Sequence, residues 1–217
     1  SVRRQRQMCI RDSSITSSDT GEATVESLIQ FTSANWDTPQ NVTVTGVDDG
    51  IIDGAQTSTI TVTIVDAITD DDFDAVADQT VSVTTTDDDV AGFTIAETSG
   101  STGVDESGST DIFTVVLNAE PSSNVVLDIT SSDTGEATVT SSLTFTSANW
   151  DTAQTVTVTG VDDDLIDGTI SSSITVTVND GSSDDNFDAV ADQTVSVTTT
   201  DDDAVSYTHL TLPTNGT

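Results

Sequence analysis

The chain of 217 residues is a polyanion, with 38 Asp and Glu against 4 Lys and Arg and a formal net charge of −34 at pH 7. This charge excludes binding to nucleic-acid phosphates and to anionic membrane surfaces. Residues 14–203 contain no Lys, Arg, His or Cys, which excludes salt bridges, disulfides and His- or Cys-based nucleophilic catalysis within them. Paired carboxylates could hydrolyse a glycoside, but acids on the loops of a small repeated unit indicate no cleft, so we expect no enzyme.

Both ends of the chain can be derived from one DNA sequence, read on opposite strands. Residues 3–13 (RRQRQMCIRDS) reverse-translate into a sequence that resembles the adapter of a transposase-made sequencing library, and residues 204–215 (AVSYTHLTLPTN) translate its reverse complement. We therefore expect residues 1–13 and 204–217 to be adapter-derived and to form no part of the fold.

Between these ends the chain repeats itself with an offset of 114 residues. Residues 17–89 return without a gap as residues 131–203, and 55 of the 73 positions are identical. A period this long is the size of a small domain. The sequence therefore predicts the last two-thirds of one unit at residues 14–89 and a complete unit at residues 90–203.

The complete unit alternates apolar and hydroxyl residues, as in Thr155-Val-Thr-Val-Thr159. This period of two predicts half-buried strands. We expect seven of them, at residues 92–97 (continuing towards 104), 111–117, 124–130, 137–145 (interrupted at 141–142), 155–159, 173–178 and 194–200. Seven short strands predict an all-β, immunoglobulin-like antiparallel sandwich. Phe145 and Trp150 are expected in its core, with a ligand contact as the alternative for Trp150. No apolar run is long enough to span a bilayer.

Strand parity gathers acidic loops at one pole of this sandwich. The loops after the first, third and fifth strands share a pole with the exit of the seventh, because alternate strands run in opposite directions. The acids at that pole are Glu106, Asp133, Glu136, Asp162, Asp163, Asp164, Asp167, Asp201, Asp202 and Asp203, and the first copy carries Asp48, Asp49, Asp53, Asp87, Asp88 and Asp89. Oxygen ligands without His or Cys favour Ca²⁺ over zinc or copper. A solvated acidic pole is the alternative.

This framework resembles the Calx-beta domain over residues 90–203 and the truncated copy before them. The resemblance implies several Ca²⁺ ions at the pole where one domain meets the next. It makes Glu106 the early glutamate ligand and Leu165 a backbone-carbonyl ligand. Asp162 and Asp163 would be the paired aspartates, residues 201–203 the terminal acids, and Asp133 or Glu136 the mid-domain acid. The chain departs from the family after the aspartate pair, where it has only Asp167 in place of glutamates, and the first copy has Gly50 in place of Asp164.

The resulting hypothesis is a non-enzymatic calcium-binding repeat of an extracellular bacterial adhesin or stalk. Its partners are the neighbouring repeats of the same chain, and Ca²⁺ stiffens the junction where residues 87–89 run towards Gly92. Two alternatives stay open. One is a metal-independent immunoglobulin-like spacer with a solubilising acidic surface. The other is a carbohydrate-binding domain, which would need exposed aromatic residues on one face.

Overall fold

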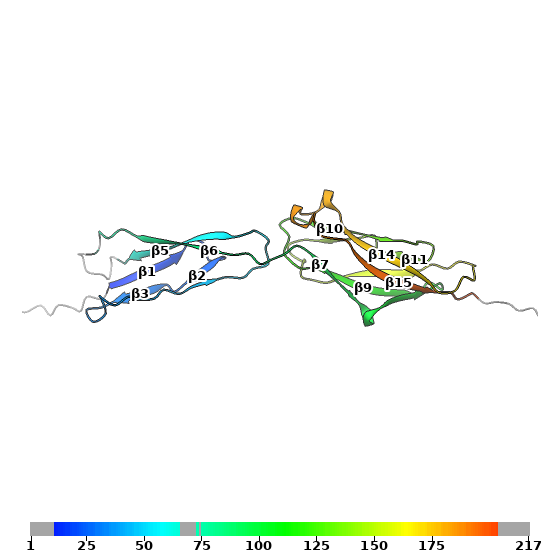
Figure 1. The fold of residues 1–217 in the computed structure, drawn as a ribbon, viewed down its shortest axis with the longest axis horizontal. Helices are drawn as coiled ribbons and strands as arrows, with labels where there is room; N and C mark the ends of the chain where they lie inside the picture. Colours follow the sequence, from blue (N-terminus) through cyan, green and yellow to red (C-terminus); the bar gives the residue numbers. More distant parts are fainter. Residues whose placement is uncertain (1–10, 66–72, 74, 204–217) are drawn as a thin grey trace, which may run out of the picture. The chain divides into compact units, whose positions relative to one another are not determined.

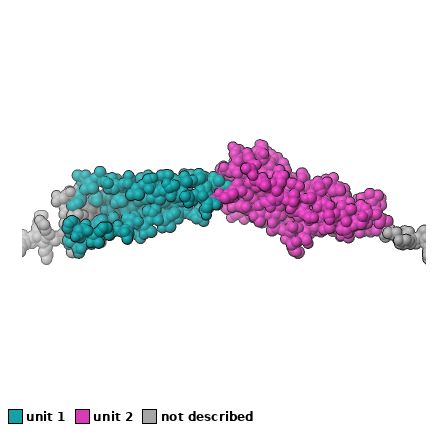
Figure 2. Space-filling model, in the orientation of Figure 1, with its two compact units in different colours: residues 1–88 teal, residues 89–217 magenta. Residues whose placement is uncertain are grey.

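A computed structural model describes residues 11–65, 73 and 75–203 of the chain. They form two compact units, divided between Asp88 and Asp89 and coloured separately in Figure 2. Each unit consists of β-strands with short turns. Within the described ranges, no helix has the length and hydropathy needed to cross a membrane.

Unit 2 begins at Asp89 and contains two facing sheets (Figure 1). The first sheet has the order β12-β10-β14-β15-β8. Its strands are β8 (Thr102–Asp105), β10 (Val125–Ser131), β12 (Ser142–Phe145), β14 (Ile170–Val178) and β15 (Gln193–Thr200). All its pairings are antiparallel except that of β8 with β15, which is parallel.

The second sheet of unit 2 has the order β11-β13-β9-β7 and is antiparallel throughout. Its strands are β7 (Phe93–Glu97), β9 (Thr110–Leu117), β11 (Ala137–Val139) and β13 (Gln154–Gly160). Three 3₁₀ turns join the strands: η2 (Thr98–Gly100), η3 (Asp180–Ser182) and η4 (Asp185–Phe187).

The alternating sequence builds the core between the two sheets. Every second residue of a strand points to the same face, so the apolar residues of facing strands meet and the hydroxyl residues face water. Phe113, Leu127, Phe145, Val158 and Ile174 are all completely buried. The core is thus continuous across both sheets.

The predicted all-β sandwich is confirmed, and each of the seven expected segments contains at least one strand. The first segment is divided between the sheets as β7 and β8, because Ser99 (φ 61°) and Gly100 (φ 80°) turn the backbone between them. The segment 137–145 is likewise divided into β11 and β12. Of the two aromatic residues expected in the core, Phe145 is fully buried and Trp150 is only partly buried.

Unit 1 has a four-stranded sheet of order β3-β1-β5-β6 and a two-stranded sheet of β2 and β4. The strands are β1 (Arg11–Ser17), β2 (Ala23–Val25), β3 (Leu28–Phe31), β4 (Val44–Gly46), β5 (Gln56–Ile64) and β6 (Gln79–Thr85). The pairings of β1 with β3 and β5 correspond to those of β10 with β12 and β14 in unit 2.

Strand β1 includes the last three residues of the adapter-like leader, Arg11, Asp12 and Ser13. We expected residues 11–13 to lie outside the fold, yet they pair with β3, and Ser13 is buried in the sheet. The reason is that a sheet ladder uses backbone groups, so almost any residues that continue a strand can extend it. Ser13 occupies the position that Leu127 fills 114 residues later. Residues 1–10 and 204–217 lie outside the described residues, and the predicted domain boundaries stay predictions.

Candidate metal centre

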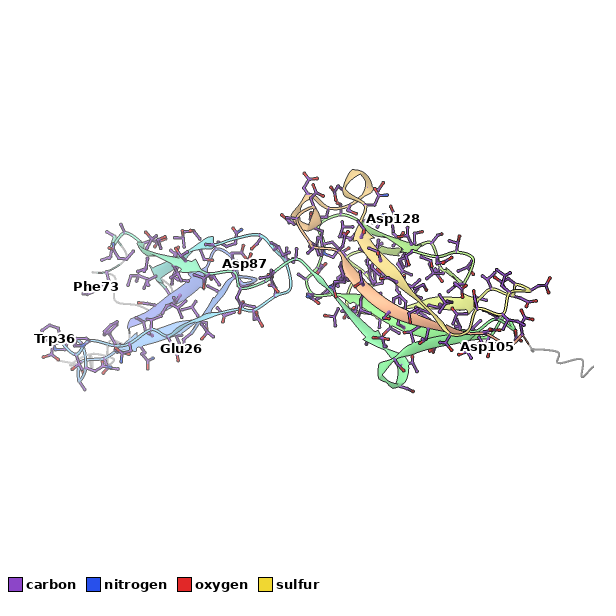
Figure 3. All side chains as sticks on the ribbon, turned by 45° about the vertical axis from the view of Figure 1, so that its right-hand side comes forward. Glu26, Trp36, Phe73, Asp87, Asp105 and Asp128 are labelled. Atoms are coloured by element: carbon purple, nitrogen blue, oxygen red, sulfur yellow. The ribbon has the colours of Figure 1, made fainter. Side chains whose placement is uncertain are left out.

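Four segments of unit 2 bring acidic side chains to one end of the sandwich. Glu106 follows β8, Glu136 precedes β11, Asp163 and Asp167 lie between β13 and β14, and Asp203 follows β15. Figure 3 labels Asp105, the neighbour of Glu106, at this end of the unit. The acidic loops therefore gather at one end of the sandwich, as the alternating strand directions predict.

The carboxylate oxygens of these residues form two groups. Glu106, Glu136 and Asp167 each offer an oxygen within 4.8 Å of the others. Glu106, Asp163 and Asp203 form a second group by the same measure. Glu106 belongs to both groups and therefore lies at the centre of the cluster.

The central acids are buried without hydrogen-bond partners. Glu106 is 1% exposed and Glu136 is 7% exposed. In the described part of the chain, neither carboxylate oxygen of Glu106 accepts a hydrogen bond of good geometry, although the backbone of Asp202 lies close enough to favour its charged form. Oε2 of Glu136 and Oδ2 of Asp203 also have no hydrogen-bond partner among these residues. Native structures rarely leave buried oxygens in this condition, because burial removes water without replacing its hydrogen bonds.

Electrostatics make the ion-free cluster unfavourable. Burial raises the pKa of Glu106, and the nearby charges of Asp201, Asp163 and Asp167 raise it further. Burial and neighbouring acids, Asp167 foremost among them, also raise the pKa of Glu136. The pKa of Asp203 is raised in the same way, by burial first and then by Asp201. Each of these groups thus resists carrying its charge unless a cation or a proton neutralises it.

The backbone holds Glu106 at this position. Its N–H donates to the carbonyl oxygen of Thr200 (3.1 Å), which continues the parallel pairing of β8 with β15. The turn crosses the end of β13 so closely that a Cβ on Gly160 would lie 1.9 Å from the carbonyl oxygen of Asp105. Only a residue without a side chain fits there. Sequence reasoning missed Gly160, although a glycine ending a strand of Val and Thr is the signal for such a close approach.

Hydrogen bonds shape the loops around the cluster. Asp163 Oδ1 accepts from the N–H of Leu165 (2.7 Å). Asp201 accepts from the N–H of Gly168 (2.8 Å) through Oδ2 and from that of Asp203 (2.7 Å) through Oδ1. Asp201 therefore ties the loop before β14 to the segment after β15.

The other predicted residues of unit 2 lie outside both groups. Asp133, Asp162, Asp164 and Asp202 are exposed, and the Leu165 side chain is 62% exposed. Asp133 Oδ1 accepts from the N–H of Gly135 (3.0 Å), an interaction within its own turn. These exposed acids add negative potential around the cluster. The structure thus favours Glu136 over Asp133 as the acid from the loop after β10.

Unit 1 carries part of the same arrangement. Asp87 Oδ2 accepts from the N–H groups of Asp53 (3.0 Å) and Gly54 (2.7 Å), much as Asp201 accepts from Gly168. Burial raises the pKa of Glu22, and Asp53 and Asp49 raise it further. Asp48 and Asp88 are exposed, and Asp89 is partly exposed. No group of three acids meets the 4.8 Å measure among the described residues of unit 1.

Two features separate the units. Unit 1 contains no counterpart of Glu106 among its described residues, since its first strand, β1, corresponds to β10. Glu22 corresponds to Glu136 and was missed by the sequence analysis of the first copy. The cluster in unit 2 supplies only carboxylate oxygens, which suit hard cations such as Ca²⁺ and not the softer zinc or copper.

Comparison with known proteins gives distant structural likenesses only. No family model matches the chain, and no curated protein matches it. Domains 4 and 5 of the S-layer protein SbsC match with 19% identity and a TM-score of 0.38, over 87% of this chain and 70% of that one. SbsC domains 4–9 match with 19% identity and a TM-score of 0.41, over 90% of this chain and 23% of that one. The apo-form Calx CBD1 domain matches with 17% identity and a TM-score of 0.37, over 51% of this chain and 98% of that domain. Likenesses this distant carry no argument for function.

Proposed function

We propose that this chain is a non-enzymatic, calcium-binding repeat module of an extracellular protein, and that unit 2 binds Ca²⁺ at its acidic end. The observation that carries the proposal is Glu106, a fully buried carboxylate whose two oxygens accept no hydrogen bond of good geometry among the described residues. A cation between the acids would supply the missing partner and offset the mutual repulsion.

The geometry favours two ions that share one ligand. One ion would be held by Glu106, Glu136 and Asp167, and the other by Glu106, Asp163 and Asp203, because these are the two groups whose oxygens approach within 4.8 Å. Ca²⁺ takes six to eight oxygens, so backbone carbonyls and water would complete each shell. Mg²⁺ requires a smaller and stricter octahedron, so we expect it to bind less well.

The adhesin or stalk role extends this proposal to the parent protein. It rests on the tandem sequence repeat and on the aspartate runs at residues 87–89 and 201–203. In a stalk, ions held by such runs would stiffen the junctions between repeats. Small-angle scattering of the chain in Ca²⁺ and in chelator tests this part, and identical profiles would contradict it.

Differential scanning calorimetry in Ca²⁺, Mg²⁺ and chelator tests the binding itself. At a free Ca²⁺ concentration of one hundred times the dissociation constant, linkage stabilises the folded state by about 2.7 kcal/mol. We expect the Tm of unit 2 to rise by roughly 10 °C in Ca²⁺ and by less in Mg²⁺. Glu106→Gln should remove most of this rise. Asp133→Asn is the matched control, since it removes one exposed acid that belongs to neither group. Equal melting in all three solutions would favour the metal-independent spacer.

A further inference from the structure

The outer face of the first sheet of unit 2 consists of hydroxyl residues along its two neighbouring strands β14 and β15 (Figure 1). Every second side chain of these strands points into the core, and the side chains between them point outwards. All eight outward positions hold serine or threonine, each exposed or half-buried: Ser171, Ser173, Thr175, Thr177, Thr194, Ser196, Thr198 and Thr200. We call these eight residues the hydroxyl face.

Strand pairing arranges these hydroxyls in rows across the sheet. Thr175 lies opposite Thr194 on β15 and opposite Thr130 on β10, so three threonines stand side by side. Unit 1 repeats this row with its own pairings, at Thr16, Thr61 and Thr80. The first copy has serine or threonine at all eight positions of the face, although two of them differ in identity between the copies. Both units therefore carry the same array.

The hydroxyl face carries no charge, although the chain has 38 acidic residues. Two acids share the outer surface of this sheet, and both lie beside end residues of the face. Asp105 pairs with Thr200, and Asp128, labelled in Figure 3, pairs with Thr177. Strand propensity favours threonine at exposed positions but does not favour serine. Propensity alone therefore does not explain a face built from both.

The composition of this face excludes several classes of partner. It offers no aromatic side chain on which a sugar ring could stack, and no charge that would attract an ion or a charged polymer. The cores of protein interfaces are enriched in aromatic residues, Met and Arg and depleted in serine, so a second copy of the chain is a poor match. The face suits a neutral partner that forms hydrogen bonds at regular intervals.

We propose that the hydroxyl face binds ice. Neighbouring strands lie about 4.8 Å apart, and residues two positions apart on one strand are separated by about 6.7 Å, so the hydroxyl groups repeat in two directions. The oxygen atoms of an ice surface repeat at comparable spacings in two directions. Water bound to the hydroxyls and held between the threonine methyl groups can therefore occupy positions of the ice lattice.

Sheet twist limits this match to a few residues on each unit. Adjacent strands are rotated by roughly 20–25° relative to one another, so only neighbouring strands keep the spacing. Both units carry the array, and weak contacts made by one chain add to each other. The face consists of strand residues outside both groups of acids, so ice binding is independent of the calcium proposal.

Ice-affinity partitioning of the full chain tests the proposal. A slowly growing ice front rejects ordinary proteins and incorporates those that bind ice. Tryptophan fluorescence then gives the amount of chain in the ice and in the remaining liquid. We expect the chain to be enriched in the ice relative to serum albumin, which serves as the protein that does not bind. Incorporation no greater than that of albumin would overturn the proposal.

Paired lysine variants test whether the hydroxyl face is the surface that binds. Thr80→Lys with Thr194→Lys places a charge in the threonine row of each unit and should reduce incorporation to the albumin level. Thr84→Lys with Thr198→Lys, further along the same strands, should cause the same loss. Exposed substitutions of this kind change stability little, and circular dichroism checks that each variant keeps its strands.

Asn41→Lys with Thr155→Lys is the matched control, because these exposed residues lie outside the face and occupy equivalent positions in the two copies. The control adds the same charge and should leave incorporation unchanged. Incorporation of the Thr80→Lys and Thr194→Lys variant equal to that of the natural chain, or an equal loss in the control, would overturn the assignment of the face.

Discussion

Substituting Gly160 by Ala should weaken Ca²⁺ binding, although Gly160 is not one of the proposed ligands. The new Cβ would lie 1.9 Å from the carbonyl oxygen of Asp105 and 2.9 Å from its carbonyl carbon. Non-bonded atoms need roughly 3 Å, so the turn that carries Glu106 has to move by about 1 Å. Metal–ligand distances tolerate changes of only about 0.2 Å. We expect Ca²⁺ affinity to fall about 10- to 100-fold, as for other changes behind metal ligands.

The same change should also destabilise unit 2. Overpacking typically costs about 1–3 kcal/mol, which lowers the Tm of a domain this size by roughly 4 to 12 °C. Isothermal titration calorimetry gives the affinity, and scanning calorimetry in chelator gives the stability without the ion. Gly46→Ala is the matched control, because its Cβ meets only Thr85 Cγ2 at 3.7 Å. If Gly160→Ala and Gly46→Ala left Ca²⁺ affinity equally unchanged, the claim that the close crossing at Gly160 positions Glu106 would be refuted.

Three further predictions concern stability. In chelator, unit 2 should become more stable as the pH falls from 7 to about 4.5, because folding raises the pKa values of Glu106, Glu136 and Asp203. The protonated acids stabilise the folded state fully at low pH, and this stabilisation is lost as the pH rises through their raised pKa values. Saturating Ca²⁺ should flatten or reverse this trend, and calorimetry across that range that finds no difference between the two solutions would contradict it. Ser13→Leu should stabilise unit 1 to urea by about 1–2 kcal/mol, because the equivalent Leu127 is fully buried, and a loss of stability would show that the site has no room. Ser172→Ala should raise stability by up to about 1 kcal/mol, because the buried hydroxyl has no partner among the described residues, whereas a clear loss would show that it has one.

The sandwich was predictable because its strands alternate strictly. The segment 170–178 shows the agreement well, since its buried and less buried residues alternate along the whole of β14. The division of the first strand between two sheets was not predictable in the same way. It depends on a turn at Ser99, whose φ is positive. A serine in the sequence does not indicate a positive φ.

The acidic end was predictable as a location and not as a ligand set. Parity placed Glu106, Glu136 and residues 201–203 at one end, and the structure places them there. Which acids turn inwards depends on backbone hydrogen bonds within the loops, such as those that Asp201 accepts. Neighbouring aspartates in a run are chemically identical. The sequence therefore gives no means to separate half-buried Asp163 from exposed Asp162 and Asp164. The burial of Glu106 follows from the close crossing at Gly160, a contact between segments far apart in the chain.

Isothermal titration of Ca²⁺ into the chelator-treated full chain tests the central claim most directly. The two groups that share Glu106 predict saturable binding of two ions to unit 2. Glu106→Gln should abolish or severely weaken both sites, because it removes the shared ligand, while Asp133→Asn should leave the stoichiometry unchanged. Saturable binding that Glu106→Gln does not alter would contradict the assigned site. No saturable binding at millimolar Ca²⁺ would contradict the calcium function itself.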